Sequence, residues 1–163
     1  MHQYFNSPIG RLRIDADQRK LRGVSMAAET GEDLPSELSQ RAALQLQEYF
    51  ETKRKEFNIF FIPMGTPFQM QVWSKLSEIP YGKVVTYGQL AAAIGQPTAV
   101  RAVANAVGEN PFLIFLPCHR VVAADGLGGF SAGLEAKRAL LRLEGVEISE
   151  NTAFSEKFLF TFE

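Results

Sequence analysis

Hydrophobic and polar positions alternate over three short stretches at the start of the chain. These stretches are residues 3–5, 12–15 and 21–26, and the turn-forming run Ser7-Pro8-Ile9-Gly10 separates the first two. Alternation with a period of two is typical of strands that bury one face, so an antiparallel sheet is predicted. After a polar loop, Ser36 is a candidate N-cap for a helix whose apolar face would carry Leu38, Ala42, Leu46, Tyr49 and Phe50.

The pattern changes at Pro63-Met64-Gly65. Residues 57–62 have strand character, and the proline and glycine then interrupt it. Thr66-Pro67 combines an N-cap with a proline at the first helical position, which predicts a new helix. Trp73 is expected in the core beside the apolar positions of this helix, which are Phe68, Val72, Leu76 and Ile79.

Two short predicted helices surround a glycine turn further along. Thr86 is a candidate cap for the first helix, Gly95-Gln96-Pro97 ends it, and Thr98 is a candidate cap for the second, which runs over 99–107. This pair is a helix-turn-helix candidate, although any helical hairpin gives the same pattern. The second helix is rich in alanine and Arg101 is its only basic residue, so its smooth surface suits either a core or a narrow groove.

The remaining pattern predicts a strand over Val121–Ala124, a glycine-rich loop over 125–129, and a last helix from Ser131 through Leu143. Gly145 stands in the C-cap position of that helix. The loop is no phosphate-binding loop, because the lysine and the strand-to-helix context of that motif are missing. The fold class is therefore α+β.

We place a domain boundary after residue 63. Residues 1–63 would form an α/β domain, 64–150 a mostly helical second domain, and 151–163 a phenylalanine-containing tail that could pack or dangle. At 163 residues and 46% hydrophobic composition the chain can bury a real core.

Charge and cysteine content narrow the function classes. The chain has 17 Lys and Arg against 18 Asp and Glu, so no global basic field indicates a polyanion partner, and nucleic-acid binding would depend on a local surface. The sequence has no apolar run of about 18 residues and no signal-peptide pattern. A single cysteine fits a reducing compartment. We therefore expect a soluble cytoplasmic protein without membrane association.

That single cysteine, Cys118, lies in the string Pro117-Cys118-His119-Arg120. A lone thiol can form no intrachain disulfide and no thiolate metal site, so its structural use is limited to filling a small space. The neighbouring imidazole and guanidinium predict a positive environment that favours the nucleophilic thiolate. In an extended strand, however, His119 would point away from the thiol, so direct pairing needs a turn or a bridging water. Arg120 is either a surface charge or a buried partner for an acid such as Glu144.

Several short strings in the second domain, taken together, closely resemble the O6-alkylguanine-DNA alkyltransferase family, also called methylated-DNA–protein-cysteine methyltransferases. The resemblance covers about residues 63 to 146 in order and spacing. The strings are Phe68-Gln69, Val72-Trp73, Ile79-Pro80-Tyr81-Gly82, Thr86-Tyr87-Gly88-Gln89-Leu90-Ala91, Val100-Arg101-Ala102-Val103, Asn110-Pro111, Pro117-Cys118-His119-Arg120-Val121-Val122, and Gly129-Phe130-Ser131-Ala132-Gly133-Leu134 with Lys137.

The resemblance implies a monomeric DNA repair protein that flips a damaged base out of duplex DNA. The alkyl group of O6-alkylguanine, and of O4-alkylthymine, would move irreversibly and stoichiometrically to Cys118 without any cofactor or metal. His119 would act through a water as the base, and Glu144 would hold its other ring nitrogen. Asn110 would orient the region around the thiol, and Tyr87 would donate to a guanine ring nitrogen. It also implies a ribonuclease H-like first domain and a winged-helix-like second domain with the helix-turn-helix.

The same resemblance implies the DNA contacts. Arg101 would enter the base stack where the base leaves, Gln96 would contact the DNA backbone, and the backbone at Ser131 would donate to O6, with Tyr87 beside it. Taken alone, these residues have plainer interpretations, such as a surface arginine, a helix cap at Ser131 and a half-buried aromatic at Tyr87. Two departures stand out, because Ala104 and Ala132 occupy positions where glycine is common in the family.

Two other function classes remain as alternatives. A helix-turn-helix module that binds lesions without transfer would explain residues 86–107, whereas a Cys-His hydrolase or acyltransferase would explain residues 117–120. The first would leave Cys118 unmodified, and the second would turn over. With two histidines and one cysteine, the first domain cannot assemble the zinc site that some relatives carry.

Overall fold

The computed structural model describes every residue except 30 and 149–151. The chain divides into two compact units, which we describe separately. The first unit contains Met1–Pro63 with Pro111–Phe115, and the second contains Met64–Asn110 with Leu116–Glu163.

The first unit is an antiparallel sheet with one long helix. Its strands are β1 (His2–Ser7), β2 (Gly10–Ala16) and β3 (Leu21–Met26), in the spatial order β1-β2-β3. The predicted strands are confirmed, each within a few residues of its expected bounds. Apolar residues of β2 and β3 such as Leu12, Ile14 and Val24 are buried.

Helix α1 (Glu37–Phe50) confirms the predicted cap and the predicted apolar face. The Ser36 hydroxyl accepts from the Ser39 amide at 3.0 Å, and the Ser39 hydroxyl accepts from the Ser36 amide at 2.9 Å. This reciprocal pair satisfies two amides that the first turn of a helix leaves free. The buried apolar face carries Leu38, Ala42, Leu46 and Tyr49, whereas Phe50, the fifth predicted position, is only partly buried.

Residues 57–62, which were expected to be a strand, and the apolar run that precedes Cys118 form only isolated bridges. Phe61 bridges Leu21, and Phe112 bridges Val24. The prediction of a strand over 57–62 is therefore wrong. The apolar run before Cys118 is not a regular strand either, since Ile114 has a φ of +72°. The physical reason is that both segments use the same free edge of β3, so neither extends into a ladder.

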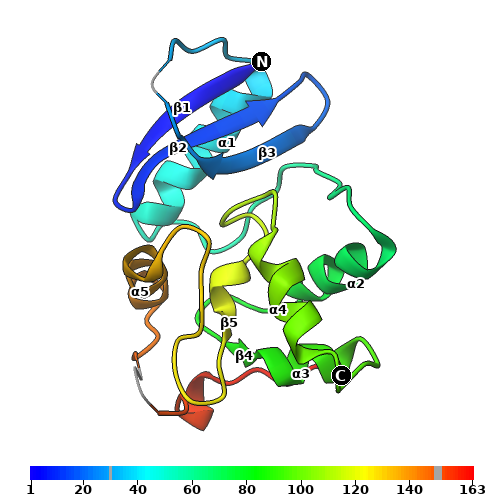
Figure 1. The fold of residues 1–163 in the computed structure, drawn as a ribbon. Helices are drawn as coiled ribbons and strands as arrows, with labels where there is room; N and C mark the ends of the chain where they lie inside the picture. The colour runs from blue at the N-terminus through cyan, green and yellow to red at the C-terminus, as the bar shows by residue number, and fades with distance from the viewer. Residues whose placement is uncertain (30, 149–151) are drawn as a thin grey trace. The chain divides into compact units, whose positions relative to one another are not determined.

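The second unit is mostly helical, as predicted (Figure 1). Helices α2, α3 and α4 pack against one another, and α3 and α4 form the expected helix-turn-helix. Its elements are α2 (Pro67–Leu76), β4 (Val85–Thr86), α3 (Tyr87–Ala93), α4 (Val100–Gly108), a 3₁₀ turn at Cys118–Arg120, β5 (Val121–Val122), α5 (Leu134–Leu143) and a short 3₁₀ turn at Glu156–Phe158. Strands β4 and β5 pair in parallel.

Two of these helices, α2 and α3, have the N-caps that the sequence predicted. The hydroxyls of Thr66 and Thr86 accept from the amides of Gln69 and Gln89 at 3.1 and 3.0 Å. Each glutamine side chain returns a hydrogen bond to the threonine amide, which completes a capping box. Trp73 is buried, as predicted, and its indole N–H donates to the Ala106 carbonyl at 2.9 Å.

Two other predicted caps are wrong. Helix α4 follows Ala99 and has no side-chain cap, so Thr98 does not cap it. Helix α5 begins at Leu134 after Gly133, whose φ is +97°, and Ser131 does not cap it. Ser131 is too far before the first turn of α5 to cap it. The chain between them turns at Gly133, in a conformation that only glycine adopts readily. The C-terminal end of α5 is as predicted, with Gly145 at a φ of +85°.

The last predicted strand and the C-terminal tail differ in detail from what the sequence predicted. Strand β5 is shorter than the predicted Val121–Ala124, since Ala123 already turns back to bridge Gly126. The tail packs, because Phe154 and Phe158 are buried in a cluster with Val84, Val122, Leu127, Leu141 and Val146. Across residues 1–29, 31–148 and 152–163, no helix combines the length and apolar character needed to cross a bilayer.

Candidate active site

Cys118 is the first residue of the 3₁₀ turn, and only 2% of its surface is exposed. The Asn110 amide nitrogen lies 3.0 Å from its sulfur and 2.8 Å from the Leu116 carbonyl oxygen. One side chain from the end of α4 therefore fixes both the thiol and the backbone that leads into the turn. This placement agrees with the orienting role expected of Asn110.

His119 is completely buried, and its Nε2 lies 2.7 Å from Oε2 of Glu144. The same carboxylate receives two hydrogen bonds from the guanidinium of Arg120, at 2.9 and 3.0 Å. The backbone amide of Gly82 also donates to Glu144 Oε1 at 3.0 Å. Arg120 is thus the buried partner of Glu144, not a surface charge. The 3₁₀ turn removes the strand alternation that would have forced neighbouring side chains to opposite faces.

The hydrogen bonds determine which ring nitrogen of His119 carries the proton. Burial opposes ionisation of Glu144, but the hydrogen bonds from His119 and Arg120 and the charge of Arg120 outweigh it and hold the pKa of this carboxyl well below its usual range. Burial also lowers the pKa of His119, although Glu144 opposes that effect, so the ring is neutral at pH 7. An ionised carboxylate only accepts, so Nε2 must donate the proton. Nδ1 then bears a lone pair, and it has no hydrogen-bond partner among the described residues.

The expected thiolate-favouring environment is not found. Burial raises the pKa of Cys118 to about 11, although the hydrogen bond from Asn110 and the charge of Lys137 oppose it. The guanidinium that the sequence places beside the thiol is engaged with Glu144 instead. The resting thiol is therefore neutral, and its proton must leave during the reaction.

Lys137 is a further functional candidate. It belongs to the motif quoted above, but the sequence alone assigned it no role. Its side chain is fully buried in α5, and its ammonium donates to the carbonyls of Val121, Leu127 and Gly129 at 2.6, 2.6 and 2.9 Å. Burial lowers the pKa of Lys137 to about 8, so the group is still mostly protonated at pH 7. Its position on the apolar face of the helix, three residues before Leu140, is the signal that could have identified it.

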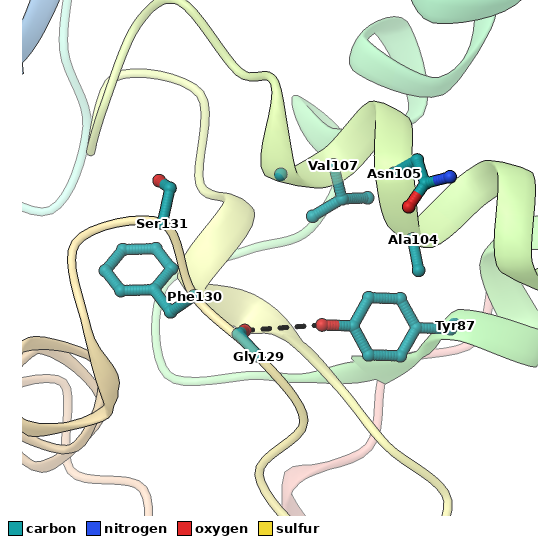
Figure 2. A pocket seen from close by; sticks show the side chains of 8 residues that line it. Tyr87, Ala104, Asn105, Val107, Gly129, Phe130 and Ser131 are labelled. Atoms are coloured by element: carbon teal, nitrogen blue, oxygen red, sulfur yellow. Dashed lines mark hydrogen bonds between the residues drawn. The ribbon is translucent and has the colours of Figure 1, made fainter.

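A pocket of about 250 Å³ lies between α4, Tyr87 and the loop before α5 (Figure 2). Val107, Phe130 and Gly129 of the glycine-rich loop contribute to its wall. The Tyr87 hydroxyl points to this loop and donates to the Gly129 carbonyl at 3.3 Å. The full lining is Tyr87, Ala104, Asn105, Val107, Gly108, Gly129, Phe130 and Ser131.

Gly128 allows the tyrosine to approach the loop so closely. Its φ is +74°, and a Cβ there would lie 2.8 Å from the ring of Tyr87 and 3.2 Å from the Ala123 amide nitrogen. Because both the backbone conformation and the space exclude a side chain, this position requires glycine. The Gly129 carbonyl then accepts from both Tyr87 and Lys137.

The predicted site residues fall into three sets. Cys118, His119, Glu144 and Asn110 form the buried hydrogen-bonded group, whereas Tyr87 and Ser131 line the pocket. Lys137 links these two sets, because it binds the loop carbonyls and its charge acts on the thiol. The third set is exposed, with Arg101 on α4 and Gln96 in the turn before it, and neither residue lines the pocket.

Comparison with known proteins places this site in a family. Residues 67–146 match the family described as 6-O-methylguanine DNA methyltransferase, DNA binding domain, and residues 1–63 match the ribonuclease-like domain of the same family. A methylated-DNA–protein-cysteine methyltransferase of Methanosarcina acetivorans is 42% identical over 149 residues, which are 86% of this chain and 96% of the relative.

Solved structures agree. The crystal structure of the Mycobacterium tuberculosis O6-methylguanine methyltransferase matches with a TM-score of 0.80 at 39% identity, covering 88% of this chain and 91% of that one. A structure of the protein from the same organism in complex with DNA has the same TM-score, at 40% identity and the same coverage. The matches extend over both units and include every residue of the buried thiol group. This chain therefore belongs to the 6-O-methylguanine DNA methyltransferase family.

Proposed function

We propose that this chain repairs alkylated DNA by moving the alkyl group from O6 of guanine onto the sulfur of Cys118. Family membership supports the reaction class, which is DNA repair by direct transfer to a protein cysteine. The observation that carries the assignment to this residue is a buried thiol next to a neutral imidazole whose other nitrogen is held by an ionised carboxylate. O4-alkylthymine is the second substrate that we expect.

His119 acts as the base in this proposal. Its Nδ1 carries a lone pair, and one water between Nδ1 and the thiol would pass the proton from sulfur to nitrogen. The imidazolium that forms remains 2.7 Å from the Glu144 carboxylate, which stabilises it. Arg120 keeps that carboxylate ionised and oriented, so it is a positioning residue. This is the nucleophile, base and orienter logic of other cysteine enzymes.

The transfer step is an in-line displacement at carbon. The sulfur electron pair forms the new S–C bond while the C–O6 bond breaks, and its electrons pass into the guanine ring. The Tyr87 hydroxyl, whose pKa burial raises further above 10, stays protonated and can donate to a ring nitrogen as charge develops there. The backbone amide at Ser131 would donate a hydrogen bond to O6. The ammonium of Lys137 stabilises the sulfur anion as the proton leaves.

We propose duplex DNA containing O6-alkylguanine as the partner, with α4 entering a groove. Base extrusion costs a few kcal/mol, and a side chain that fills the gap offsets part of this cost. Exposed Arg101 on α4 is suited to that role, and Gln96 to a contact with the DNA backbone. Ala104, where glycine is common in the family, lines the pocket at the side that α4 contributes.

The product limits each molecule to one reaction. Cys118 is the only cysteine, so no second thiol can resolve the thioether, and a thioether does not hydrolyse. The protein is therefore expected to act as a stoichiometric reagent. We further expect it to work as a monomer in the cytoplasm, where a lone thiol stays reduced.

The test mixes the protein with a duplex that contains one O6-methylguanine and weighs both products. The expected result is one methyl group on the peptide that contains Cys118 and an unmodified guanine in the DNA. Cys118→Ser, which keeps a small polar side chain, should leave both masses unchanged. Binding without a mass change would indicate the lesion-binding alternative, and multiple turnovers would indicate a hydrolase or acyltransferase; either result would refute the proposal.

A further inference from the structure

The C-terminal tail is the part of the second unit that the family match does not reach. The matched DNA-binding domain ends at residue 146, whereas residues 152–163 are described and packed. Phe154 and Phe158 of this segment are both buried. The tail therefore makes specific contacts whose purpose the family match does not explain.

The tail forms an isolated parallel bridge with Val84, the residue that precedes β4. The Val84 amide donates to the Phe158 carbonyl at 2.8 Å, and the Phe160 amide donates to the Val84 carbonyl at 2.9 Å. Leu159 is the bridge partner of Val84 in this pairing. Because Val84 is fully buried, both of its backbone groups depend on the tail for hydrogen bonds.

Gln89 couples the tail to the first turn of α3. Its side-chain oxygen accepts from the Thr86 amide at 2.8 Å, and its side-chain nitrogen donates to the Phe160 carbonyl at 3.3 Å. Thr86 is the N-cap of α3, and the next residue, Tyr87, lines the pocket. One amide group thus joins the tail to the backbone that aims the tyrosine.

The tail supports the opposite side of the tyrosine as well. Phe154 and Phe158 share their buried cluster with Leu127. The next residue, Gly128, packs against the ring of Tyr87, and Gly129 accepts from its hydroxyl. The tail therefore contacts both the helix that carries Tyr87 and the glycine loop that accepts its hydrogen bond.

We propose that residues 154–160 act as a brace that positions Tyr87 for binding the extruded base, a role that rests on the proposed function. The brace contacts neither the thiol group nor the substrate directly, and it works by fixing the distance between α3 and the glycine loop. The tail is thus a positioning element of the alkyl-transfer site and not a passive extension.

The decisive variant is Gln89→Glu. Glutamate keeps an oxygen that accepts from the Thr86 amide, so the capping box survives, but it replaces the donor to Phe160 with a second acceptor. Gln71→Glu, which makes the same change on an exposed position of α2, is the matched control. We expect Gln89→Glu to slow single-turnover transfer from a lesion-containing duplex about 5–10-fold, the effect of one lost hydrogen bond, with Gln71→Glu within twofold of the parent.

The double variant with Tyr87→Phe separates positioning from general destabilisation. If the brace acts through the tyrosine hydroxyl, Gln89→Glu should cost less than about twofold once that hydroxyl is gone, because contacting sites are not additive. An equal loss in both backgrounds, or no loss in the parent, would overturn the proposal. The same cycle with residues 153–163 deleted tests the whole segment.

Amide hydrogen exchange tests the positioning role of the tail without relying on methyl transfer. Gln89→Glu and the deletion should each speed exchange in peptides covering residues 84–93 and 123–130, whether or not the wild-type protein transfers a methyl group. Unchanged exchange in both peptides would also overturn the brace. If exchange changes but the wild-type protein never methylates Cys118, the proposed function fails and the brace remains.

Discussion

The neutral, buried thiol of Cys118 leads to a prediction about the pH dependence of transfer. Its pKa is raised to about 11 by burial. Ionising such a thiol before attack at pH 7 would cost about 5 kcal/mol, since each pH unit is worth about 1.4 kcal/mol. If free thiolate were the nucleophile, the logarithm of the rate would rise with unit slope from pH 6 to about 11.

The geometry predicts a different profile. Neutral His119 can take the proton as attack proceeds, so the rate should follow the fraction of neutral imidazole. Burial lowers the pKa of His119 below its ordinary value of 6.5, and protonated imidazole cannot accept a proton. The rate should therefore fall below this lowered pKa and stay constant around pH 7. It should decline again above about pH 8, where Lys137, whose pKa is about 8, loses the charge that stabilises the sulfur anion.

His119→Gln removes the base but keeps an N–H that can donate to Glu144. At pH 7 the transfer rate should fall about 10²–10⁴-fold, the usual contribution of a general base. The remaining rate should rise with unit slope toward the pKa of the thiol. Single-turnover transfer from O6-benzylguanine, quenched and weighed across pH 6–10, measures both profiles. A unit slope in the parent protein, or a flat profile in the variant, would refute the role of His119.

Three further variants test the surrounding contacts. Glu144→Gln leaves buried Arg120 without its charge partner, so unfolding should require about 3–5 kcal/mol less in denaturant titration, and transfer should slow at least tenfold. Lys137→Met removes the ammonium donor from the buried carbonyls of Val121 and Leu127, at a cost of about 1–3 kcal/mol each, and a melting temperature that does not fall would contradict this. Gly128→Ala adds a Cβ against Tyr87 at positive φ, and calorimetry should show a loss of about 1–2 kcal/mol together with slower transfer.

Local sequence chemistry was enough to predict much of the framework. The caps at Ser36, Thr66 and Thr86 were predictable because each helix start is decided by hydrogen bonds within four residues. The strands of the first unit follow from alternation alone. The string around Cys118 predicted the reaction class through its resemblance to a family. Where the same local signals failed, at Thr98 and Ser131, the helix begins one residue and three residues later than predicted.

The properties of the thiol could not be obtained in this way. The sequence places Arg120 two residues from Cys118, which predicts a stabilised thiolate, but the fold directs the guanidinium to Glu144 and buries the sulfur. A pKa depends on desolvation and on charges brought close by residues distant in sequence. The proton on Nε2 of His119 likewise depends on a carboxylate 25 positions away.

The sequence by itself indicated the candidate residues for the chemistry and predicted most of the helices and strands, because those signals lie in neighbouring side chains. Only the tertiary structure decided how the chemistry is arranged. It buried the thiol and placed the ammonium of Lys137 against three backbone carbonyls. It also joined the tail to the helix that carries Tyr87, through the hydrogen bond from Gln89 to Phe160. These features depend on packing between segments that are far apart in the chain, and no local pattern records which surface a buried side chain will meet.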